Sequence, residues 1–407
     1  MGPFPLPPLP FLLLVSLALA ADIGLLILLL GLQRVFSRAP RLEALAVDQP
    51  LPNSDLTVVI PAYNEAGNIA ACVSAVLASD PPCDRWSLMV VDDDSSDSTD
   101  QLAREAAAAC GAQQNRFTPL QAGPRPVGEH WVGKNWACSC AAEQLRSDWV
   151  LFLDADVRLH PQTLRRALLQ AERDQADLLS LAPRLSCTCL AEWMVQPIMA
   201  SLLGLGFPIE AANNPKSEVA FAAGPFMLFR RTAYEQIGGH RSLASEVVED
   251  LALARRIKSG GFCLRYLLGL DALDLQMYDN LATLWEGWSK NWFLGLDSSI
   301  AKALGAAAVV VLMFSGPWLL GGAAMLLLLL VPEQHAVCLV LLALACLGIG
   351  LQLQLRLWTQ RQFQVPLCHW WLMGVGGLLV GAIGPTSVLR TLTGRGWTWK
   401  GRSLAKS

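Results

Sequence analysis

Charged residues are scarce in this chain. They make up 16% of its 407 residues, whereas hydrophobic residues make up 53%; soluble domains average about 25% charged residues. The net charge is only −3, and no stripe of lysine and arginine with interleaved aromatics occurs. We therefore expect no nucleic-acid partner, because binding to phosphates needs a concentrated positive surface. A chain so poor in charge is instead expected to be partly embedded in a membrane.

Metal-ligand spacing is also missing among the cysteines. The eleven cysteines are scattered, and the closest pairs are Cys138-Ser-Cys140 and Cys187-Thr-Cys189. Structural zinc sites usually space their ligands as C-x₂₋₄-C and add a second pair or histidines. His130 and His160 do not supply that pattern. Buried or free thiols are therefore expected rather than a zinc site.

No basic residue precedes the first apolar run, Phe11–Leu32, which is long enough to span a bilayer at roughly 20 residues. A signal peptide would carry such residues, and the possible cleavage site Ala18-Leu19-Ala20 is followed by more apolar chain. We therefore expect an uncleaved anchor. Arginines follow the run, so the positive-inside rule predicts an integral membrane protein with its polar middle on the cytoplasmic side.

Apolar segments return later in the chain, at 303–331, 335–351 and 367–389. Basic residues between the last two segments and in the tail both favour the cytoplasm. The last segment must then enter and return, or the longest must form a tight hairpin, and the sequence leaves the number of spans open. The expected domains are an anchor with a basic linker (1–50), a folded middle with interfacial helices (51–300), and membrane segments with a basic tail (301–407).

Between these apolar parts, short runs rich in β-formers alternate with helical stretches. This pattern is typical of βαβ units and predicts an α/β fold with a mostly parallel sheet. The predicted strands are Leu56–Ile60, Leu88–Val91, Trp149–Leu153 and Leu178–Leu181. The predicted helices are Ala66–Ala78, Ser98–Ala109, Lys134–Leu145 and Gln162–Arg173.

Polar residues follow the first three of these strands at the point where each strand ends. The segment 61–65 (PAYNE) follows the first strand, 92–97 (DDDSSD) the second, and 154–156 (DAD) the third. Ligands of open α/β sheets bind beyond the carboxyl ends of the strands, so these turns are expected to converge on one edge. For Asn64 and Asp97 the alternative is a purely structural role in helix capping.

The carboxylates of these three turns, brought near one edge, would repel one another unless a cation or hydrogen-bond donors offset them. Asp154 and Asp156 are two residues apart, and in an extended segment such residues face the same side. Carboxylate oxygens suit a hard divalent ion, which usually also takes phosphate oxygens. The sequence therefore predicts Mg²⁺ or Mn²⁺ at Asp154 and Asp156, the alternative being a solvated acidic turn.

Taken in order, the motifs resemble those of the family 2 glycosyltransferases, over about residues 55–300. Five segments carry the resemblance: VVIPAYNEAGNI (58–69), VVDDDSSDST (90–99), LFLDADV (151–157), AAGPFMLFRRTAYEQIGG (222–239) and VVED (247–250). The resemblance implies a GT-A-like domain that binds a nucleotide sugar, with a mostly parallel sheet, flanked here by transmembrane helices.

The resemblance also implies a binding site for the nucleotide base of a sugar donor. Asp93 would hydrogen-bond the base, and Pro61, Tyr63 and Glu65 would shape the pocket around it. Asp94 departs from the family, because many members have glycine at this position.

Further roles are implied for the remaining acidic motifs. Asp154 and Asp156 match the D-x-D motif that holds the metal and the donor's ribose and diphosphate. Asp250, in the pair with Glu249, matches the catalytic base, which an inverting transfer needs on the sugar face opposite the leaving diphosphate. The alternative is an acidic pair in the first turn of a helix. Lys134, at a predicted helix start, either faces phosphate or lies on the surface.

Membrane segments on both sides of the folded middle favour an acceptor dissolved in the bilayer. The segment 190–208 is too polar at its start and too broken by Pro197 to span, so it lies in the membrane interface or forms a buried core helix. Trp285, Trp288 and Trp292 recur on one helical face. These rings either stack on a sugar or an apolar acceptor, or pack at the membrane boundary.

Processive polysaccharide synthases of the family carry Q-x-x-R-W in this region, and this chain does not. The stretches LWEGWSKN (284–291) and GRGWTWKGR (394–402) resemble bacterial carotenoid glycosyltransferases of the myxol and chlorobactene type, with hopanoid-associated glycosyltransferases as near relatives. The resemblance implies an inverting, metal-dependent transfer of a single sugar to a hydroxyl of a membrane lipid, in the first place a hydroxylated carotenoid. The alternatives are a hopanoid or another polyprenyl or glycolipid acceptor, and a non-catalytic membrane protein that binds nucleotide sugars.

Overall fold

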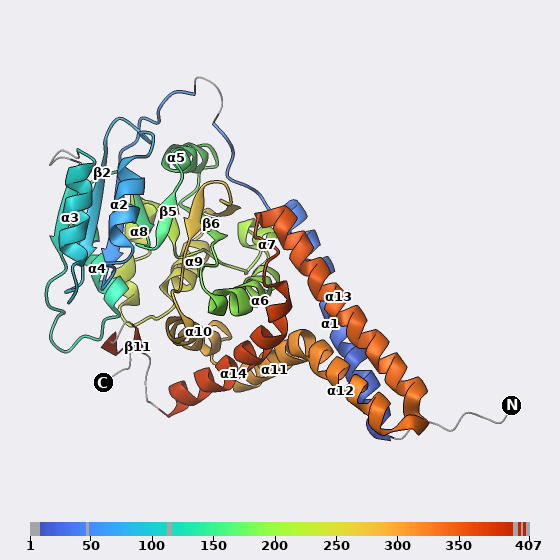
Figure 1. The fold of residues 1–407 in the computed structure, drawn as a ribbon. Helices are drawn as coiled ribbons and strands as arrows, with labels where there is room; N and C mark the ends of the chain where they lie inside the picture. Colours follow the sequence, from blue (N-terminus) through green and yellow to red (C-terminus); the bar gives the residue numbers. More distant parts are fainter. Residues whose placement is uncertain (1–8, 46–48, 112–115, 394–397, 400–401, 404–407) are drawn as a thin grey trace. The chain divides into compact units, whose positions relative to one another are not determined.

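The computed structural model describes residues 9–45, 49–111, 116–393, 398–399 and 402–403 (Figure 1). The chain forms two compact units, each assembled from several segments. The sheet unit comprises Arg38–Ser186, Phe207–Met277 and Thr398–Ser407, and the apolar unit comprises Met1–Ser37, Cys187–Gly206 and Tyr278–Trp397. This grouping by contacts does not follow the linear boundaries 1–50, 51–300 and 301–407, which stay a prediction.

The sheet unit is built around seven strands in the order β3-β2-β1-β4-β8-β6-β9. Neighbouring strands are parallel except at β8, which is antiparallel to β4 and to β6. The predicted α/β class with a mostly parallel sheet is therefore confirmed. The chain order reverses at β1, with β2 on one side and β4 on the other, so the turns after these three strands share one edge. The strands are β1 (Leu56–Ala62), β2 (Trp86–Asp92), β3 (Phe117–Gln121), β4 (Trp149–Leu153), β6 (Leu178–Ala182), β8 (Phe226–Arg230) and β9 (Leu264–Leu268).

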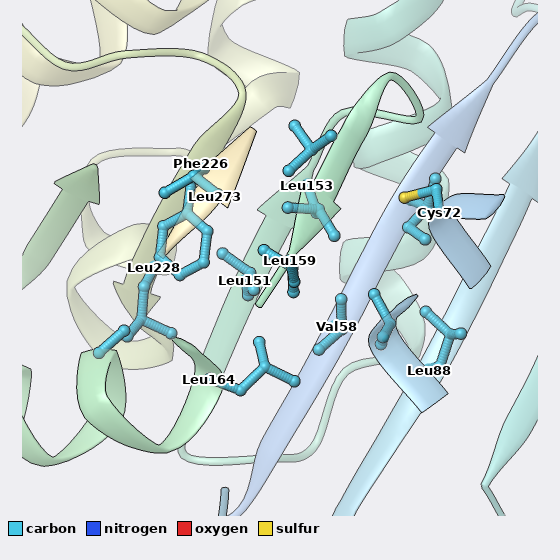
Figure 2. Packing of buried hydrophobic residues seen from close by; sticks show 14 of the residues in the cluster. Val58, Cys72, Leu88, Leu151, Leu153, Leu159, Leu164, Phe226, Leu228 and Leu273 are labelled. Carbon is cyan, nitrogen blue, oxygen red and sulfur yellow. The ribbon is translucent and has the colours of Figure 1, made fainter. Parts of the chain in front are cut away.

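Both faces of this sheet are covered, because alternate residues of a strand point to opposite sides. On β4, Leu151 and Leu153 pack into one buried cluster, while Val150 and Phe152 pack into another. Figure 2 shows the first cluster, in which Leu151 of β4 lies near Val58 of β1, its partner in the parallel register. A strand buried on both faces reads as a continuous apolar run, which is why β4 was easy to predict.

Helices from two sets cover the two faces. The first cluster takes residues from α2 (Ile69–Leu77), α3 (Thr99–Ala109) and α5 (Thr163–Arg173), and α2 and α3 lie side by side (Figure 1). The second takes residues from α4 (Gly133–Gln144), α8 (Arg231–Gln236) and α9 (Glu249–Ser259). The remaining elements of the unit are α7 (Ile209–Asn213), η1 (His240–Leu243), a three-stranded sheet of β5 (Val157–Leu159), β10 (Leu273–Leu275) and β7 (Arg184–Leu185), and a two-stranded sheet of β11 (Thr398–Trp399) and β12 (Arg402–Ser403).

The predicted elements are present with small shifts in their ends. The helix predicted from Ala66 begins at Ile69, because the carbonyl oxygen of Glu65 accepts hydrogen bonds from the amides of Asn68 and Ile69, and the chain turns there first. The strands β3, β5, β7, β8, β9 and β10 were not predicted. All eleven cysteines are free, as expected.

Among its described residues, the apolar unit contains four helices long and apolar enough to cross a membrane: Leu9–Arg38, Ile300–Leu330, Pro332–Phe363 and Trp370–Leu392. They are compatible with the predicted membrane association. The helix Ile300–Leu330 continues through a π-helical turn at Val311–Ser315, so the hairpin alternative for the longest apolar segment is wrong. The last of the four helices, Trp370–Leu392, also continues without a break through Pro385. The individual elements are α1 (Leu9–Arg38), α11 (Ile300–Val310), η2 (Val311–Ser315), α12 (Gly316–Leu330), η3 (Pro332–Gln334), α13 (His335–Phe363), η4 (Trp370–Leu372) and α14 (Met373–Leu392).

The first helix packs as part of this bundle. Helices α12 and α13, joined by η3, lie side by side (Figure 1), and Ala18 of α1 joins a buried cluster with residues of both. Asp22 of α1 is buried, and neither carboxylate oxygen has a hydrogen-bond partner within the described residues. A Cβ at Gly348 of α13 would lie 2.6 Å from Asp22 Oδ1. Only glycine therefore leaves room for this carboxylate.

Two further helices belong to the same unit, α6 (Leu190–Gly206) and α10 (Leu281–Gly295). Trp288 of α10 donates its indole N–H to Gln196 Oε1 of α6 at 2.8 Å, and Trp292 donates to the carbonyl oxygen of Ala303 at 3.1 Å. Both tryptophans are buried, so they pack within the unit, whereas Trp285 is half-buried. Sugar or acceptor stacking by Trp285 and Trp288 stays a prediction.

Close packing of α14 on α6 depends on a glycine. A Cβ at Gly376 would collide with the backbone carbonyl oxygen of Met194. We expect Gly376→Ala to force the helices apart and to cost about 1–3 kcal/mol, the usual penalty of overpacking. The apparent Tm of the full-length protein in detergent should fall by several degrees. Gly322→Ala is the matched control, because no atom lies within 4 Å of its Cβ position; equal Tm values for the two variants would contradict the packing.

Candidate active site

Three polar turns meet at the edge formed by the carboxyl ends of β1, β2 and β4. The carbonyl oxygen of Ala62, the last residue of β1, accepts a hydrogen bond from the amide of Asp93 at 2.9 Å. The amide of Asn64 donates to Ser95 Oγ at 3.0 Å, and Asn64 Oδ1 accepts from the amide of Ser96 at 2.9 Å. The turns after β1 and β2 are therefore held together as one pair of loops.

Asp97 contacts a helix start, as the capping alternative predicted, whereas the hydrogen bonds of Asn64 given above join the two turns. Asp97 Oδ1 accepts from the amide of Thr99 at 3.0 Å, at the start of α3, and Oδ2 accepts from the amide of Ala66 at 3.1 Å. Asn64 and Asp94 have φ angles of 51° and 61°. This left-handed region favours glycine and tolerates asparagine and aspartate better than most other residues. Aspartate at position 94 is therefore compatible with a turn that often holds glycine.

Asp93 is buried, with 2% of its side chain exposed, and it binds two arginines. Arg125 Nη2 donates to Asp93 Oδ2 at 2.7 Å, and Arg402 Nη1 donates to the same oxygen. Arg402 Nη2 also donates to the Asp93 carbonyl oxygen at 3.0 Å, and its guanidinium carbon lies 3.8 Å from the centroid of the Tyr63 ring. Burial raises the pKa of Asp93, although both arginines act against this. Arg402 thus contacts both Asp93, which was predicted to hydrogen-bond the base, and Tyr63, which was predicted to shape the pocket around it.

Pro61 and Glu65 lie on either side of Tyr63 in the first turn. Pro61 pairs with Val91 at the end of the parallel strands β1 and β2. The amide of Glu65 donates to Thr99 Oγ1 at 2.8 Å. These contacts fix the backbone that presents the Tyr63 ring, which agrees with the pocket-shaping role predicted for Pro61 and Glu65 without testing it.

Lys134 links the D-x-D turn to the acidic pair. It is the second residue of α4, and its Nζ lies 2.8 Å from Asp154 Oδ1 and 2.7 Å from Glu249 Oε1. Burial alone would lower the pKa of Lys134, but the two carboxylates outweigh burial and hold it well above its ordinary value. Lys134 is therefore no isolated surface lysine. Asp154 and Glu249, distant in sequence, meet at one ammonium group.

Asp156 carries a buried oxygen that nothing satisfies. Its Oδ1 has no hydrogen-bond partner within the described part of the chain. Burial, together with the charges of Asp154 and Glu65, raises the pKa of Asp156 well above its ordinary value. Leaving such an oxygen unpaired is costly, so this position suits a ligand that arrives with the substrate.

The donor set at Asp154 and Asp156 fits a hard divalent cation, because it consists of carboxylate oxygens alone. Among the residues that the structure describes, no group of three or more histidine, cysteine or acidic side chains is placed to hold a metal. Magnesium is commonly bound by one or two carboxylates, with substrate phosphates and waters completing its shell. The two aspartates therefore fit an ion shared with a diphosphate rather than a closed protein site.

Asp250 lies in the first turn of α9, which begins at Glu249. Its Oδ1 accepts from the amide of Leu251 at 2.7 Å, and its Oδ2 accepts from the amide of Gly224 at 3.1 Å. A Cβ at position 224 would lie only 2.9 Å from that Oδ2, so the close approach requires glycine. Burial, and then the charge of Glu249, raises the pKa of Asp250 to about 6. Asp250 thus lies in the first turn of a helix, as the structural alternative expected, and also has the raised basicity that a catalytic base needs.

All predicted site residues except Trp285 and Trp288 lie in the sheet unit. The structure also reveals functional candidates without a predicted role: Arg125, Arg402 and Gly224. Arg125 lies in the loop between β3 and α4, where no motif marks it. The charge of the tail containing Arg402 indicated only a cytoplasmic location. For Gly224, the glycine inside the AAGPF segment was the available signal.

Comparison with known proteins identifies similar enzymes. Residues 57–238 match the model of Glycosyl transferase family 2. The chain is 26% identical over 248 residues to 4,4'-diaponeurosporenoate glycosyltransferase of Staphylococcus haemolyticus (strain JCSC1435). The matched region covers 60% of this chain and 62% of that protein. It is 25% identical over 283 residues to the protein of the same name from Staphylococcus aureus (strain MRSA252), with 69% and 71% covered. The chain thus spans less than two thirds of the first relative.

Among solved structures, the fold is similar to that of a mannosyltransferase from Pyrobaculum calidifontis in complex with GDP-Man and Mn²⁺. The TM-score is 0.50 at 17% sequence identity, over 93% of this chain and 99% of that chain. At this identity the likeness concerns the fold alone. The GT-A-like fold and the family resemblance expected from the motifs are both confirmed.

The ion pair between Lys134 and Glu249 can be tested by a double-mutant cycle. We expect Lys134→Met and Glu249→Gln to be coupled by about 1 kcal/mol in the free energy of unfolding, because the pair is largely shielded from water. The shifts in Tm should be measured on the four purified proteins without nucleotide or metal. A control cycle uses Arg85→Met and Asp55→Asn, since the Arg85 side chain is 77% exposed. Coupling no larger than that of the control would contradict the bridging position of Lys134.

Proposed function

We propose that this chain, whose residues 57–238 match the model of Glycosyl transferase family 2, is a glycosyltransferase. It transfers a single sugar from a nucleoside-diphosphate sugar to a membrane lipid, with inversion and with a divalent metal ion. The observation that carries the proposal is the convergence of three acidic groups within the sheet unit. Asp93, next to Tyr63, is the proposed base contact, Asp154 and Asp156 are the proposed cation ligands, and Asp250 is a carboxylate of raised basicity.

The donor is expected to extend along the loops at this edge. Its base stacks on Tyr63 and hydrogen-bonds Asp93, and its diphosphate lies toward Asp154 and Asp156. Lys134 stands in the first turn of α4, where an ammonium and the positive end of the helix dipole favour negative charge. The ammonium now bridges Asp154 and Glu249, so it is already positioned among the groups that would surround the diphosphate.

Mg²⁺ or Mn²⁺ would be held by Asp154 and Asp156, and when bound it would stabilise the negative charge that develops on the departing diphosphate.

Asp250 then acts on the acceptor. Backbone donors at Gly224 and Leu251 orient its carboxylate, and a pKa of about 6 keeps it deprotonated near neutral pH while raising its basicity. Direct displacement with a base of this kind requires no covalent enzyme intermediate. Glu249 supports the raised pKa of Asp250 through its charge.

The acceptor is proposed to be a carotenoid. The four apolar helices and α6 support a lipid acceptor, with the catalytic domain on the cytoplasmic side of a bacterial inner membrane. The two relatives act, by their names, on 4,4'-diaponeurosporenoate. Trp285 and Trp288 of α10 are the proposed aromatic contacts for the sugar or the apolar acceptor. A hopanoid is the second candidate acceptor, and a host lacking the gene should lose glycosylated carotenoids and keep glycosylated hopanoids by mass spectrometry.

The relatives' name also raises a chemical distinction. The ending -oate in that name denotes a carboxylate. A hydroxyl acceptor must lose a proton as it attacks, whereas a carboxylate is already an anion. A base is essential only in the first case. Dependence of the rate on Asp250 therefore separates a hydroxylated acceptor from an acidic one, and a non-catalytic binding protein would show no dependence because it consumes no donor.

For a hydroxyl acceptor, Asp250→Asn should reduce kcat by roughly 10²–10⁴-fold, the usual contribution of a general base. Binding of nucleoside diphosphate should persist, because the base and metal sites are unchanged. The assay uses purified protein in lipid nanodiscs with hydroxylated carotenoid and a panel of nucleotide sugars. Glu246→Gln, an exposed neighbour, serves as the control.

The pH profile of the wild type gives a second readout of Asp250. The base works only when deprotonated, and its pKa is raised to about 6. The rate should therefore be constant above about pH 7 and fall below pH 6, by tenfold per pH unit in the acidic limb. A profile that stays flat down to pH 5, or full activity in Asp250→Asn, would remove Asp250 as the base.

Metal dependence is tested by removal and return of the ion. We expect chelation with EDTA to abolish transfer and MnCl₂ or MgCl₂ to restore it, with Asp156→Asn requiring far more metal than the wild type. Metal binding should be followed directly by the Mn²⁺ EPR signal in the presence of nucleoside diphosphate, which reports on the site independently of turnover. Asp100→Asn, in the first turn of α3, is the control. Full activity in EDTA would contradict the proposal.

A further inference from the structure

The segment after the last apolar helix contributes a residue to the candidate base site. Strands β11 and β12 pair with each other, with Trp399 opposite Arg402. Arg402 then reaches Asp93 with both terminal nitrogens, one to the carboxylate and one to the backbone carbonyl oxygen. Its guanidinium lies over the face of the Tyr63 ring, with the central carbon 3.8 Å from the ring centroid. All of these residues belong to the sheet unit.

These contacts and a bound nucleotide base exclude each other. A base stacked on Tyr63 would occupy the layer, about 3.5–4.0 Å above the ring, in which the guanidinium now lies. The hydrogen bond predicted from a base to Asp93 would need the carboxylate that Arg402 now engages. The guanidinium is itself planar, stacks on aromatic rings and donates hydrogen bonds in its plane, so it resembles a base in shape and in hydrogen bonding.

We propose that the paired strands β11 and β12 form an autoinhibitory strap whose Arg402 occupies the nucleotide-base subsite, so that the sugar donor binds only after the strap has left. The inference rests on the proposed function, because it takes Asp93 and Tyr63 as the base site. It goes beyond that function by adding a competing occupant from the chain itself.

The arrangement allows the strap to leave at low cost. Arg125 donates to the same Asp93 oxygen at 2.7 Å, so the buried carboxylate keeps a cationic partner when Arg402 departs. In the described residues, β11 and β12 pair only with each other and not with the seven-stranded sheet. Release therefore breaks no hydrogen bond of the main sheet. When a site is covered in most molecules, its apparent affinity is its intrinsic affinity multiplied by the fraction of molecules in which it is open.

The test is a titration of full-length protein in nanodiscs with UDP and, separately, GDP, each with MnCl₂, by isothermal calorimetry. Arg402→Ala should tighten binding of the accepted nucleotide by about tenfold, as expected if roughly one molecule in ten is open in the wild type. Arg402→Lys should give an intermediate value, since lysine keeps the charge but lacks the planar, bidentate group. Arg125→Ala is the matched comparison on the same oxygen, and it should not tighten binding. Arg390→Ala, which removes one positive charge from α14, should equal the wild type.

The outcomes separate this inference from the proposed function. Nucleotide binding that is equal or weaker in Arg402→Ala than in the wild type overturns the strap and leaves the glycosyltransferase proposal intact. Absence of binding by the wild type and by every variant overturns both. Hydrogen exchange gives a readout without activity: amides near Asp93 should be less protected in Arg402→Ala than in the wild type before nucleotide is added, and equal protection counts against the strap.

Discussion

Electrostatic repulsion among the carboxylates at one edge of the sheet is the constraint on which the site depends. The β1, β2 and β4 strands bring these groups together because parallel strands end on the same side. Fixed cations and backbone amides offset most of the repulsion, with Lys134 between two acidic motifs and Arg125 on Asp93. At Asp156 the compensation is incomplete. A folded site with an unpartnered carboxylate oxygen can accept a cation with little rearrangement, because folding has already gathered the ligands.

The apolar pattern was sufficient to predict the centre of the fold. β4 was predicted to the residue because each of its side chains packs into one of two cores, and the D-x-D turn follows it directly. Shorter or edge strands such as β3 and β5 were missed because they bury fewer residues and lack a clear period. The acidic motifs were found because several carboxylates in a strand-end turn have few purely structural explanations.

The cationic part of the site could not be predicted in the same way. Arg125 and Arg402 are ordinary basic residues in sequence, and their importance comes from a long-range contact with Asp93. The spacing of the tryptophans correctly placed Trp288 on a helix, but not its partner Gln196, which another segment supplies. Local pattern thus specifies which face a residue occupies, while the identity of its neighbour depends on how distant segments meet.

The buried face of α1 has a consequence for how the protein is made. Ala18 packs with residues of α12 and α13, and Asp22 lies beside Gly348, so the partners of the first helix stand near the opposite end of the sequence. A ribosome delivers α1 long before α12 and α13. In a membrane, the Asp22 carboxyl must therefore wait in contact with lipid, or with the insertion machinery, until these two helices have been synthesised. A generic hydrophobic anchor of equal length would insert equally well, yet it would leave the late helices without the surface they assemble on.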